Sequence, residues 1–383
     1  MIDKTRLTER VLELVRIDSL SRREGAIAAR LRELLESLGA TVFMDDAGSA
    51  VGGEVGNLVA HFDGATAGAE PMLLSAHMDT VAPGEGVVPV VEGDVIRSDG
   101  RTVLGGDDKS GIAIILEVIE ALAEDGVAHG DIDVVFTICE EVGLLGAKHL
   151  DLGLVRAKTG LVLDSDSIGF LITKAPAVNH LEFEVHGLEA HAGICPERGI
   201  SAIQVAAQGI AAMPLGRIDD ETTANLGLVS GGTAVNIVPN RVVLTGEVRS
   251  HDEEKLERQT QTMQECLRQA AAGAAVELDG RVHEARVEAR IVREYDRMDV
   301  PHDTAIVRRV HEAARNLGFA VDTVAKGGGC DANVLNKRGL QVANLASGMR
   351  DIHTVHEWLD VNDLVSAARI IHEVLRLEGD HAR

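Results

Sequence analysis

A histidine and an aspartate stand close together directly after the short apolar stretch at residues 72–76. His77 is followed two residues later by Asp79. This arrangement suits an imidazole that binds a metal ion and a carboxylate that orients the imidazole. The same short pattern also occurs by chance on protein surfaces, so it indicates a metal site only if further ligands exist elsewhere in the chain.

A second acidic pair follows two glycines. Gly105 and Gly106 allow the backbone to turn tightly and to bring Asp107 toward a ligand. An aspartate at this place could instead cap the start of a helix, because its side chain accepts hydrogen bonds from free backbone N–H groups. That alternative fits Asp108 better than Asp107, so Asp107 is the second candidate ligand.

Two adjacent glutamates, Glu140 and Glu141, close the very apolar stretch at residues 134–138. Carboxylates at the mouth of a core are costly without a cation or a proton. One of the pair could bind a metal ion while the other carries a proton during a reaction. Two solvated glutamates at the start of a helix are the alternative.

Two further candidates complete the set. Asp164 follows the apolar residues 161–163, and His353 lies in a segment, residues 351–358, whose histidines could also pack in the core. Carboxylates with two imidazoles suit Zn²⁺, Co²⁺ or Mn²⁺ better than Ca²⁺, and such a set around one bridging carboxylate fits a two-metal hydrolytic site. The complete candidate set is His77, Asp107, Glu141, Asp164 and His353.

The elements that carry these residues alternate between strands and helices. The apolar patterns predict strands at residues 57–62, 72–77, 132–138 and 161–163, and helices at residues 7–15, 27–38, 110–123 and 144–150. Such alternation predicts an α/β layer with a mostly parallel sheet. Ligands of open α/β sheets bind at the carboxyl ends of the strands, where most of the candidate residues stand.

The pattern changes after about residue 174, where alternating polar and apolar side chains indicate a sheet with one solvated face. This part of the chain has about 115 residues, a common domain size. Strand patterns cover residues 180–186, 242–248 and 276–291, and helical patterns cover residues 200–213 and 253–272. We therefore expect an inserted α+β domain, residues 178–293, within a catalytic α/β domain formed by residues 1–177 and 294–383.

The composition excludes several classes of partner. The chain of 383 residues has 37 Lys and Arg against 61 Asp and Glu, and its net charge of −24 disfavours nucleic acid and anionic membrane surfaces. No segment has the roughly 20 apolar residues of a membrane span. The four cysteines form no C-x-x-C pair, and the charged N-terminal residues lack the apolar core of a secretory signal. We expect a cytoplasmic protein with reduced thiols.

Four motifs follow one another along the chain. They are H-M-D from His77, G-G-D-D-K-S-G from Gly105, C-E-E-V-G-L-L-G-A-K from Cys139 and H-T-V-H-E-W from His353. In this order they resemble the dinuclear zinc peptidase family of peptidase T, glutamate carboxypeptidase and the acetylornithine deacetylases, and D-D-K and H-x-x-H-E look closest to the peptidase T branch. The resemblance implies a mixed-sheet zinc exopeptidase catalytic domain, with an inserted α+β domain that serves as a lid and forms a homodimer.

By position, the resemblance implies a role for each candidate. These are His77 and Asp164 on one metal ion, Glu141 and His353 on the other, Asp107 as the bridge, Asp79 as the residue that orients His77, and Glu140 as the general base. Aspartate rather than glutamate at position 164 looks like the aminopeptidase and dipeptidase pattern. The implied cofactor is two divalent ions per chain, most simply Zn²⁺, with Co²⁺ and Mn²⁺ left open.

The inserted domain carries three further candidates. The resemblance implies that His191 stabilises the oxyanion, often across a dimer, and that Asn236 and Arg249 hold the backbone or carboxylate of the substrate. A turn is the alternative for Asn236, and a salt bridge at an exposed strand end is the alternative for Arg249. Cys330, which follows the glycines at residues 327–329, is given no chemistry.

These roles predict a metal-dependent exopeptidase of short peptides, most simply a tripeptide aminopeptidase, in which Glu140 takes the proton of a metal-bridging water. The alternative is an amidohydrolase, deacylase or carboxypeptidase that acts on N-acyl or N-carbamoyl amino acids. A non-catalytic metal-binding module is disfavoured because Glu140 and the complete ligand set are present. The net charge disfavours an anion-binding module.

Overall fold

The chain folds into two compact units. The computed structural model describes residues 1–66, 68–166 and 168–381. Unit 1 comprises Met1–Lys174 and Met298–Arg383, and unit 2 comprises Ala175–Arg297. Unit 2 therefore interrupts unit 1 in the chain, and the expected boundaries at 177/178 and 293/294 lie close to its ends.

A nine-stranded sheet forms the centre of unit 1. Its strands are β1 (Thr41–Met44), β2 (Leu58–Phe62), β3 (Met72–His77), β6 (Ile132–Thr137), β7 (Thr159–Val162), β8 (Phe170–Ala175), β16 (Met298–Asp299), β17 (Asp322–Ala325) and β18 (Gln341–Leu345). The neighbours β6, β3, β7 and β18 are parallel, whereas β1, β2 and β8 add antiparallel pairs. The α/β fold class with a mixed sheet is confirmed, and the sheet is less uniformly parallel than the strand pattern predicts.

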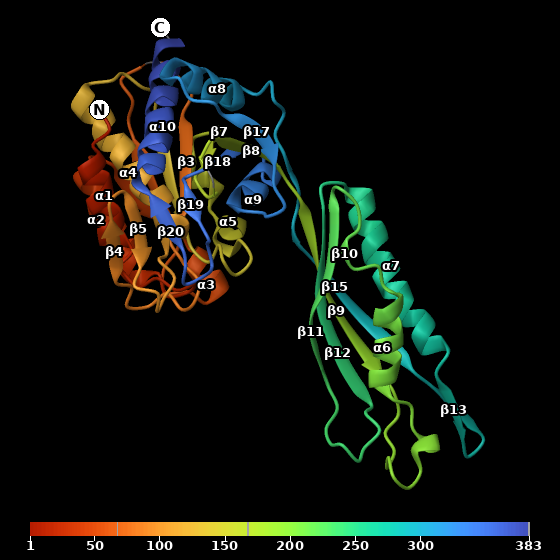
Figure 1. Cartoon of the computed structure of the whole chain (residues 1–383). Coiled ribbons are helices and arrows are strands. Elements are labelled where there is room, and N and C mark those ends of the chain that lie inside the picture. The colour runs from red at the N-terminus through yellow and green to blue at the C-terminus, as the bar shows by residue number, and fades with distance from the viewer. Residues whose placement is uncertain (67, 167, 382–383) are drawn as a thin grey trace. The chain divides into compact units, whose positions relative to one another are not determined.

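Helices cover both faces of this sheet (Figure 1). α4 (Gly106–Asp125), which is apolar on most sides and mostly buried, packs on β3. α10 (Val361–His381) packs against α4 and α8 (Ala305–Leu317), and α9 (Asp331–Lys337) packs against β18 and α5 (Leu145–His149). The other helices described in this unit are α1 (Lys4–Leu14), α2 (Gly25–Ser37) and α3 (Ala47–Val51).

A second, four-stranded sheet also belongs to unit 1. It is antiparallel and has the order β19 (Met349–Arg350), β20 (Trp358–Asp360), β5 (Val95–Ser98) and β4 (Pro89–Glu92). β19 and β20 fix the two ends of the loop that contains His353. Among the helices of the described residues, none has the length and apolar character to cross a membrane.

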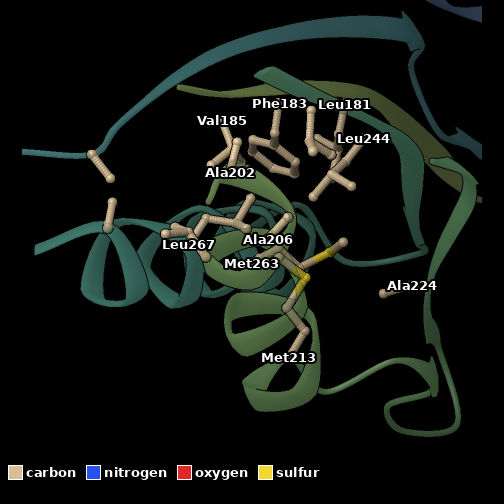
Figure 2. Packing of buried hydrophobic residues seen from close by; sticks show 14 of the residues in the cluster. Leu181, Phe183, Val185, Ala202, Ala206, Met213, Ala224, Leu244, Met263 and Leu267 are labelled. Carbon is tan, nitrogen blue, oxygen red and sulfur yellow. The ribbon is translucent and has the colours of Figure 1, made fainter. Parts of the chain in front are cut away.

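Unit 2 is an antiparallel sheet with two helices. The sheet has the order β10 (Gly216–Arg217), β11 (Thr222–Gly231), β12 (Arg241–Ser250), β9 (Ala177–His186) and β15 (Arg286–Tyr295), and β13 (Ala275–Leu278) and β14 (Arg281–Glu284) form a separate hairpin. α6 (Ala202–Ala212) and α7 (Glu253–Ala272) pack against each other and against the sheet. Figure 2 shows the core between them, where Phe183 and Leu244 of the sheet face Met263 and Leu267 of α7.

Candidate metal centre

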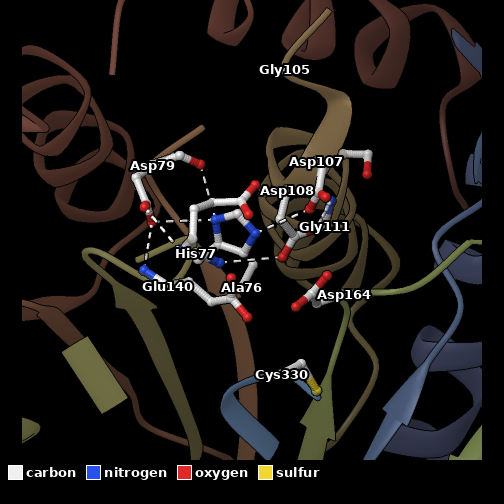
Figure 3. A network of polar contacts seen from close by, with 12 residues as sticks. Ala76, His77, Asp79, Gly105, Asp107, Asp108, Gly111, Glu140, Asp164 and Cys330 are labelled. Atoms are coloured by element: carbon white, nitrogen blue, oxygen red, sulfur yellow. Dashed lines mark hydrogen bonds and ion pairs between the residues drawn. The ribbon is translucent and has the colours of Figure 1, made fainter. Parts of the chain in front are cut away.

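The sheet of unit 1 brings three predicted ligands to one edge. β3, β6 and β7 are parallel neighbours, so their carboxyl ends lie side by side. His77 is the last residue of β3, and Asp164 follows β7. Glu140 and Glu141 follow β6. Figure 3 shows His77, Glu140 and Asp164 around the same space.

Asp107 lies between two histidines that come from different elements. Its Oδ1 atom is 3.1 Å from Nε2 of His77, and its Oδ2 atom is 3.2 Å from Nε2 of His353. One carboxylate therefore turns one oxygen toward each histidine, as a bridging ligand must. Ligand atoms around a tetrahedral zinc ion lie about 3.3 Å apart when the metal–ligand distances are about 2.0–2.1 Å. The observed spacing fits this geometry.

The candidate ligand atoms form two compact groups. One atom each from His77, Asp107 and Glu141 lies within 4.8 Å of the others, and the same holds for His77, Glu140 and Asp164. His353 joins the first group, because its Nε2 atom is 3.0 Å from the Glu141 carboxylate. The structure thus brings all five predicted ligands together, with Glu140, the predicted general base, beside them.

Asp79 accepts hydrogen bonds from His77 and from the backbone of Glu140 and Glu141. Nδ1 of His77 donates to the backbone oxygen of Asp79 at 2.9 Å, which leaves Nε2 available to a metal ion. The Asp79 carboxylate lies 3.4 Å from the same Nδ1 and accepts the backbone N–H groups of Glu140 and Glu141 at 2.9 and 3.2 Å. Ser21 donates its hydroxyl to this carboxylate at 2.6 Å. Asp79 therefore orients His77 mainly through its backbone oxygen.

The site gathers negative charge that the protein alone stabilises poorly. Burial, and next the charge of Asp164, raises the pKa of Glu140 well above its usual range. Burial, and next the charge of Asp107, raises the pKa of Asp164 in the same way. Divalent cations would relieve this repulsion, because buried carboxylates are stable when they coordinate a metal. The donor types and the electrostatics of the site therefore fit two divalent ions.

Two buried aspartates beside the ligands also contribute to the site. Asp108 accepts the backbone N–H groups of His77 and Gly111, each at 3.2 Å, so the capping alternative describes it and it also supports His77. Asp331 accepts the hydroxyl of Thr137. No role for Asp331 follows from the sequence patterns alone, although the run of glycines before it is a signal that could have identified it.

Glu357 is another buried residue near the site whose role does not follow from the sequence patterns alone. It belongs to the same H-T-V-H-E-W motif as His353, and this motif is the signal that could have identified it. Its carboxylate accepts three backbone N–H groups of the segment that carries Asp107. Burial raises the pKa of Glu357 to about 7, although these N–H groups act in the opposite direction.

Within unit 2 the structure brings His191 and Asn236 together, because their loops pair. The N–H group of Ala192 donates to the backbone oxygen of Asn236 at 2.9 Å, and His191 forms a β-bridge with Ile237. The Nδ1 atom of His191 accepts the N–H group of Gly193 at 3.2 Å. Both residues belong to unit 2, whereas the five predicted metal ligands belong to unit 1.

Arg249 lies at the opposite end of the same sheet. It pairs in register with Val178 near the start of β9, whereas the loops of His191 and Asn236 follow the other end. The ten-residue strand β9 separates these ends by about 30 Å, at about 3.4 Å per residue. Arg249 is partly buried and donates to Glu247 from Nε and Nη2 at 2.8 and 3.0 Å, and its role in substrate binding stays a prediction.

Known proteins resemble this chain over nearly its whole length. The profile of peptidase family M20/M25/M40 matches residues 73–377. YqjE of Bacillus subtilis (strain 168), described as uncharacterized, is 40% identical over 376 residues, which cover 98% of this chain and 99% of YqjE. The crystal structure of the aminopeptidase PepT from Bacillus cereus ATCC 10987 matches with a TM-score of 0.88 and 38% identity over 99% of both chains. The crystal structure of a tripeptidase from Staphylococcus aureus matches with a TM-score of 0.93 and 35% identity, over 99% of this chain and 100% of the tripeptidase.

Proposed function

The chain belongs to peptidase family M20/M25/M40 and is a metal-dependent exopeptidase, and on this premise we propose that it releases the N-terminal residue of tripeptides. The observation that carries the proposal is the Asp107 carboxylate, which turns one oxygen to His77 and the other to His353. This arrangement supports hydrolysis with two divalent ions. The similarity to an aminopeptidase and a tripeptidase supports the substrate class.

The metal ligands in this proposal are those that the resemblance implies. His77 and Asp164 would hold one ion, Glu141 and His353 would hold the other, and Asp107 would contribute to both. Zn²⁺ is the simplest choice, and the same donors accept Co²⁺ or Mn²⁺. When bound, the two ions supply Lewis-acid chemistry for the hydrolysis of an amide bond.

Glu140 moves the proton in this proposal. Its carboxylate lies with those of the ligands, close to His77 and Asp164. Burial raises the pKa of Glu140. A raised pKa suits a carboxylate that takes a proton from the attacking water molecule and then donates this proton to the leaving amine. The Oε atoms of Glu140 therefore serve as general base and then as general acid.

The resemblance to the dinuclear zinc peptidases supports a homodimer. His191 and Asn236 lie in two paired loops of unit 2. By the same resemblance we assign these two residues to the active site of a second copy, where His191 stabilises the oxyanion. The cytoplasmic location stays a prediction.

Metal analysis combined with peptide hydrolysis tests the proposed function. The purified protein should hold two metal ions per chain and should cleave trialanine at its first peptide bond. A chelator should abolish cleavage, and added Zn²⁺, Co²⁺ or Mn²⁺ should restore it. Cleavage of N-acetylated or N-carbamoylated amino acids, with no cleavage of trialanine, would favour the amidohydrolase alternative.

The variant Glu140→Gln tests the assignment of the general base. We expect kcat to fall by about 10²- to 10⁴-fold, because the amide cannot take the proton, while two metal ions stay bound. The exposed Glu124 on α4 provides a control through Glu124→Gln, which should keep wild-type kcat. Retention of most of the turnover by Glu140→Gln would remove the assignment.

Mixed dimers test whether His191 acts across subunits. Glu140→Gln and His191→Ala should each be nearly inactive alone. When the two variants are unfolded and refolded together, each mixed dimer contains one site in which both residues are intact, so activity should return to about a quarter of the wild-type value. No gain of activity on mixing, although mixed dimers form, would place His191 in the site of its own chain.

A further inference from the structure

Glu357 holds the backbone that carries Asp107. Its Oε2 atom accepts the N–H groups of Leu104 and Gly105, each at 2.8 Å, and its Oε1 atom accepts the N–H group of Asp107 at 2.9 Å. α4 begins here, with Gly105 in the left-handed region and no side-chain cap from its own N-cap residue. Glu357, 250 residues further along the chain than Asp107, therefore binds the free N–H groups at this helix start.

The three hydrogen bonds use both oxygens of the Glu357 carboxylate. An amide of the same shape offers one oxygen and turns its NH₂ group toward the remaining donor. Water cannot replace the lost acceptor easily, because Glu357 is only 1% exposed. The two acceptor oxygens of this side chain, and not its size alone, therefore determine the position of the backbone at the start of α4.

Glu357 also ends the loop that carries His353. In this loop Asp351 and His353 have φ angles of 51° and 61°, and side-chain-bearing residues keep such conformations only where the surroundings hold them. The N–H group of Glu357 donates to the backbone oxygen of Thr354 at 3.2 Å, and the indole of Trp358 donates to Asp351 at 3.2 Å. Glu357 thus connects the loop that carries His353 to the start of α4.

We propose that Glu357 is a positioning residue that sets the Asp107 carboxylate against the His353 imidazole before any metal ion binds. The proposal rests on the proposed function, in which both residues are metal ligands. The buried ammonium of Lys109 donates to the backbone oxygen of Ile17 at 2.9 Å. Its positive charge lies near Glu357 and interacts with this carboxylate electrostatically. The Glu357 carboxylate therefore keeps its oxygens for the three backbone N–H groups.

The variant Glu357→Gln tests the proposal, with Glu117→Gln as its matched control. Glu117 is a second buried glutamate of unit 1, and it accepts the N–H group of Asp3 and binds Arg6. One measurement is the dissociation constant for Zn²⁺ and Co²⁺, obtained by competition with a chelator. The other is the rise in melting temperature when metal is added to the metal-free protein. Neither measurement depends on turnover.

We expect Glu357→Gln to weaken metal binding about 10- to 100-fold, as for other partners that orient metal ligands. Its metal-induced rise in melting temperature should shrink accordingly. Glu117→Gln should bind metal like the wild type, even where its metal-free form melts earlier. Wild-type affinity in Glu357→Gln would overturn the proposal, whereas a wild-type protein that binds no pair of ions would overturn the proposed function instead.

Gly106→Ala provides a second test that applies even where the glutamine variant does not fold. A Cβ atom on Gly106 would lie 3.1 Å from Oε1 of Glu357 and 3.0 Å from Leu359, so it crowds the carboxylate by a few tenths of an ångström without removing it. We expect metal affinity to fall by about threefold or more, in the direction of Glu357→Gln. Unchanged affinity in Gly106→Ala would overturn the proposal as well.

Discussion

Glu140 and Glu141 show how neighbouring residues of one type take different positions. Glu141 lies 3.0 Å from His353 and forms a group with His77 and Asp107, whereas Glu140 forms a group with His77 and Asp164. The backbone N–H groups of both glutamates donate to the Asp79 carboxylate, which fixes the turn after β6. One aspartate therefore fixes the backbone of both the predicted metal ligand, Glu141, and the predicted general base, Glu140.

His372 on α10 predicts a pH dependence of stability. Burial lowers the pKa of this partly buried histidine below its ordinary value of 6.5. Below that pH the unfolded chain binds more protons than the folded one. The stabilisation that the neutral His372 contributes to the folded state is therefore complete above about pH 6.5 and is lost as the pH falls through the lowered pKa. Urea unfolding at about pH 7.5 and about pH 5.5 should show a smaller loss of unfolding free energy for His372→Gln than for the wild type. An equal loss in both proteins would contradict this assignment.

The sequence predicts the first and last residues of a helix or strand well where a single hydrophobic pattern covers the element. β3 spans Met72–His77 and α7 spans Glu253–Ala272, as predicted, because a continuous apolar run and a long helical period leave one interpretation. β11 (Thr222–Gly231) was not predicted, since most of its residues after Ala224 are exposed and no alternation marks it. α4 is bounded by Gly106 and Asp125, but Asp107 and Asp108 are not helical, so its regular helical backbone begins close to the predicted start at Ser110.

The same contrast applies to the candidate site. His77, Glu141 and Asp164 could be predicted because each stands at the end of an apolar strand, and parallel strands place their ends together. The role of Glu357 depends on the approach of two segments 250 residues apart. No local pattern encodes such a contact, so only the folded chain reveals it.

Gly209 on α6 allows α6 and α7 to approach closely. A Cβ atom on this glycine would lie 2.6 Å from Cδ2 of Leu267 and 3.1 Å from its Cα. Gly209→Val should therefore lower the free energy of unfolding by about 1–3 kcal/mol through overpacking. Ala207→Val, on the exposed face of the same helix, should cost only the helix propensity of valine, about 0.5 kcal/mol. Urea unfolding of both variants measures the difference, and equal costs would contradict the close approach.

For the whole molecule, the predicted metal ligands and the predicted substrate contacts belong to different units. The five ligands and Glu140 belong to unit 1, whereas His191, Asn236 and Arg249 belong to unit 2. Metal binding therefore acts on the stability of unit 1 directly. Unit 2 has its own buried core, so it does not depend on the ions for its packing.

Removal of the metal ions should destabilise unit 1 selectively. A ligand that binds only the folded state stabilises by about 4 kcal/mol at a concentration 1,000 times its dissociation constant. Treatment with a chelator should therefore speed amide hydrogen exchange in β3 and β7, while exchange in β9 and β12 stays unchanged. Equal acceleration in both units would show that the ions stabilise the chain as a whole.

The chain crosses between the units through two pairs of adjacent strands. β8 and β16, on either side of the insertion, are neighbours in the sheet of unit 1, and β9 and β15 are neighbours in unit 2. A short turn from Ala175 to Met298 would therefore leave the backbone ladders of unit 1 intact. An inserted domain can be replaced between two adjacent strands such as β8 and β16. Evolution could therefore change the residues of unit 2 without changing the predicted metal ligands of unit 1.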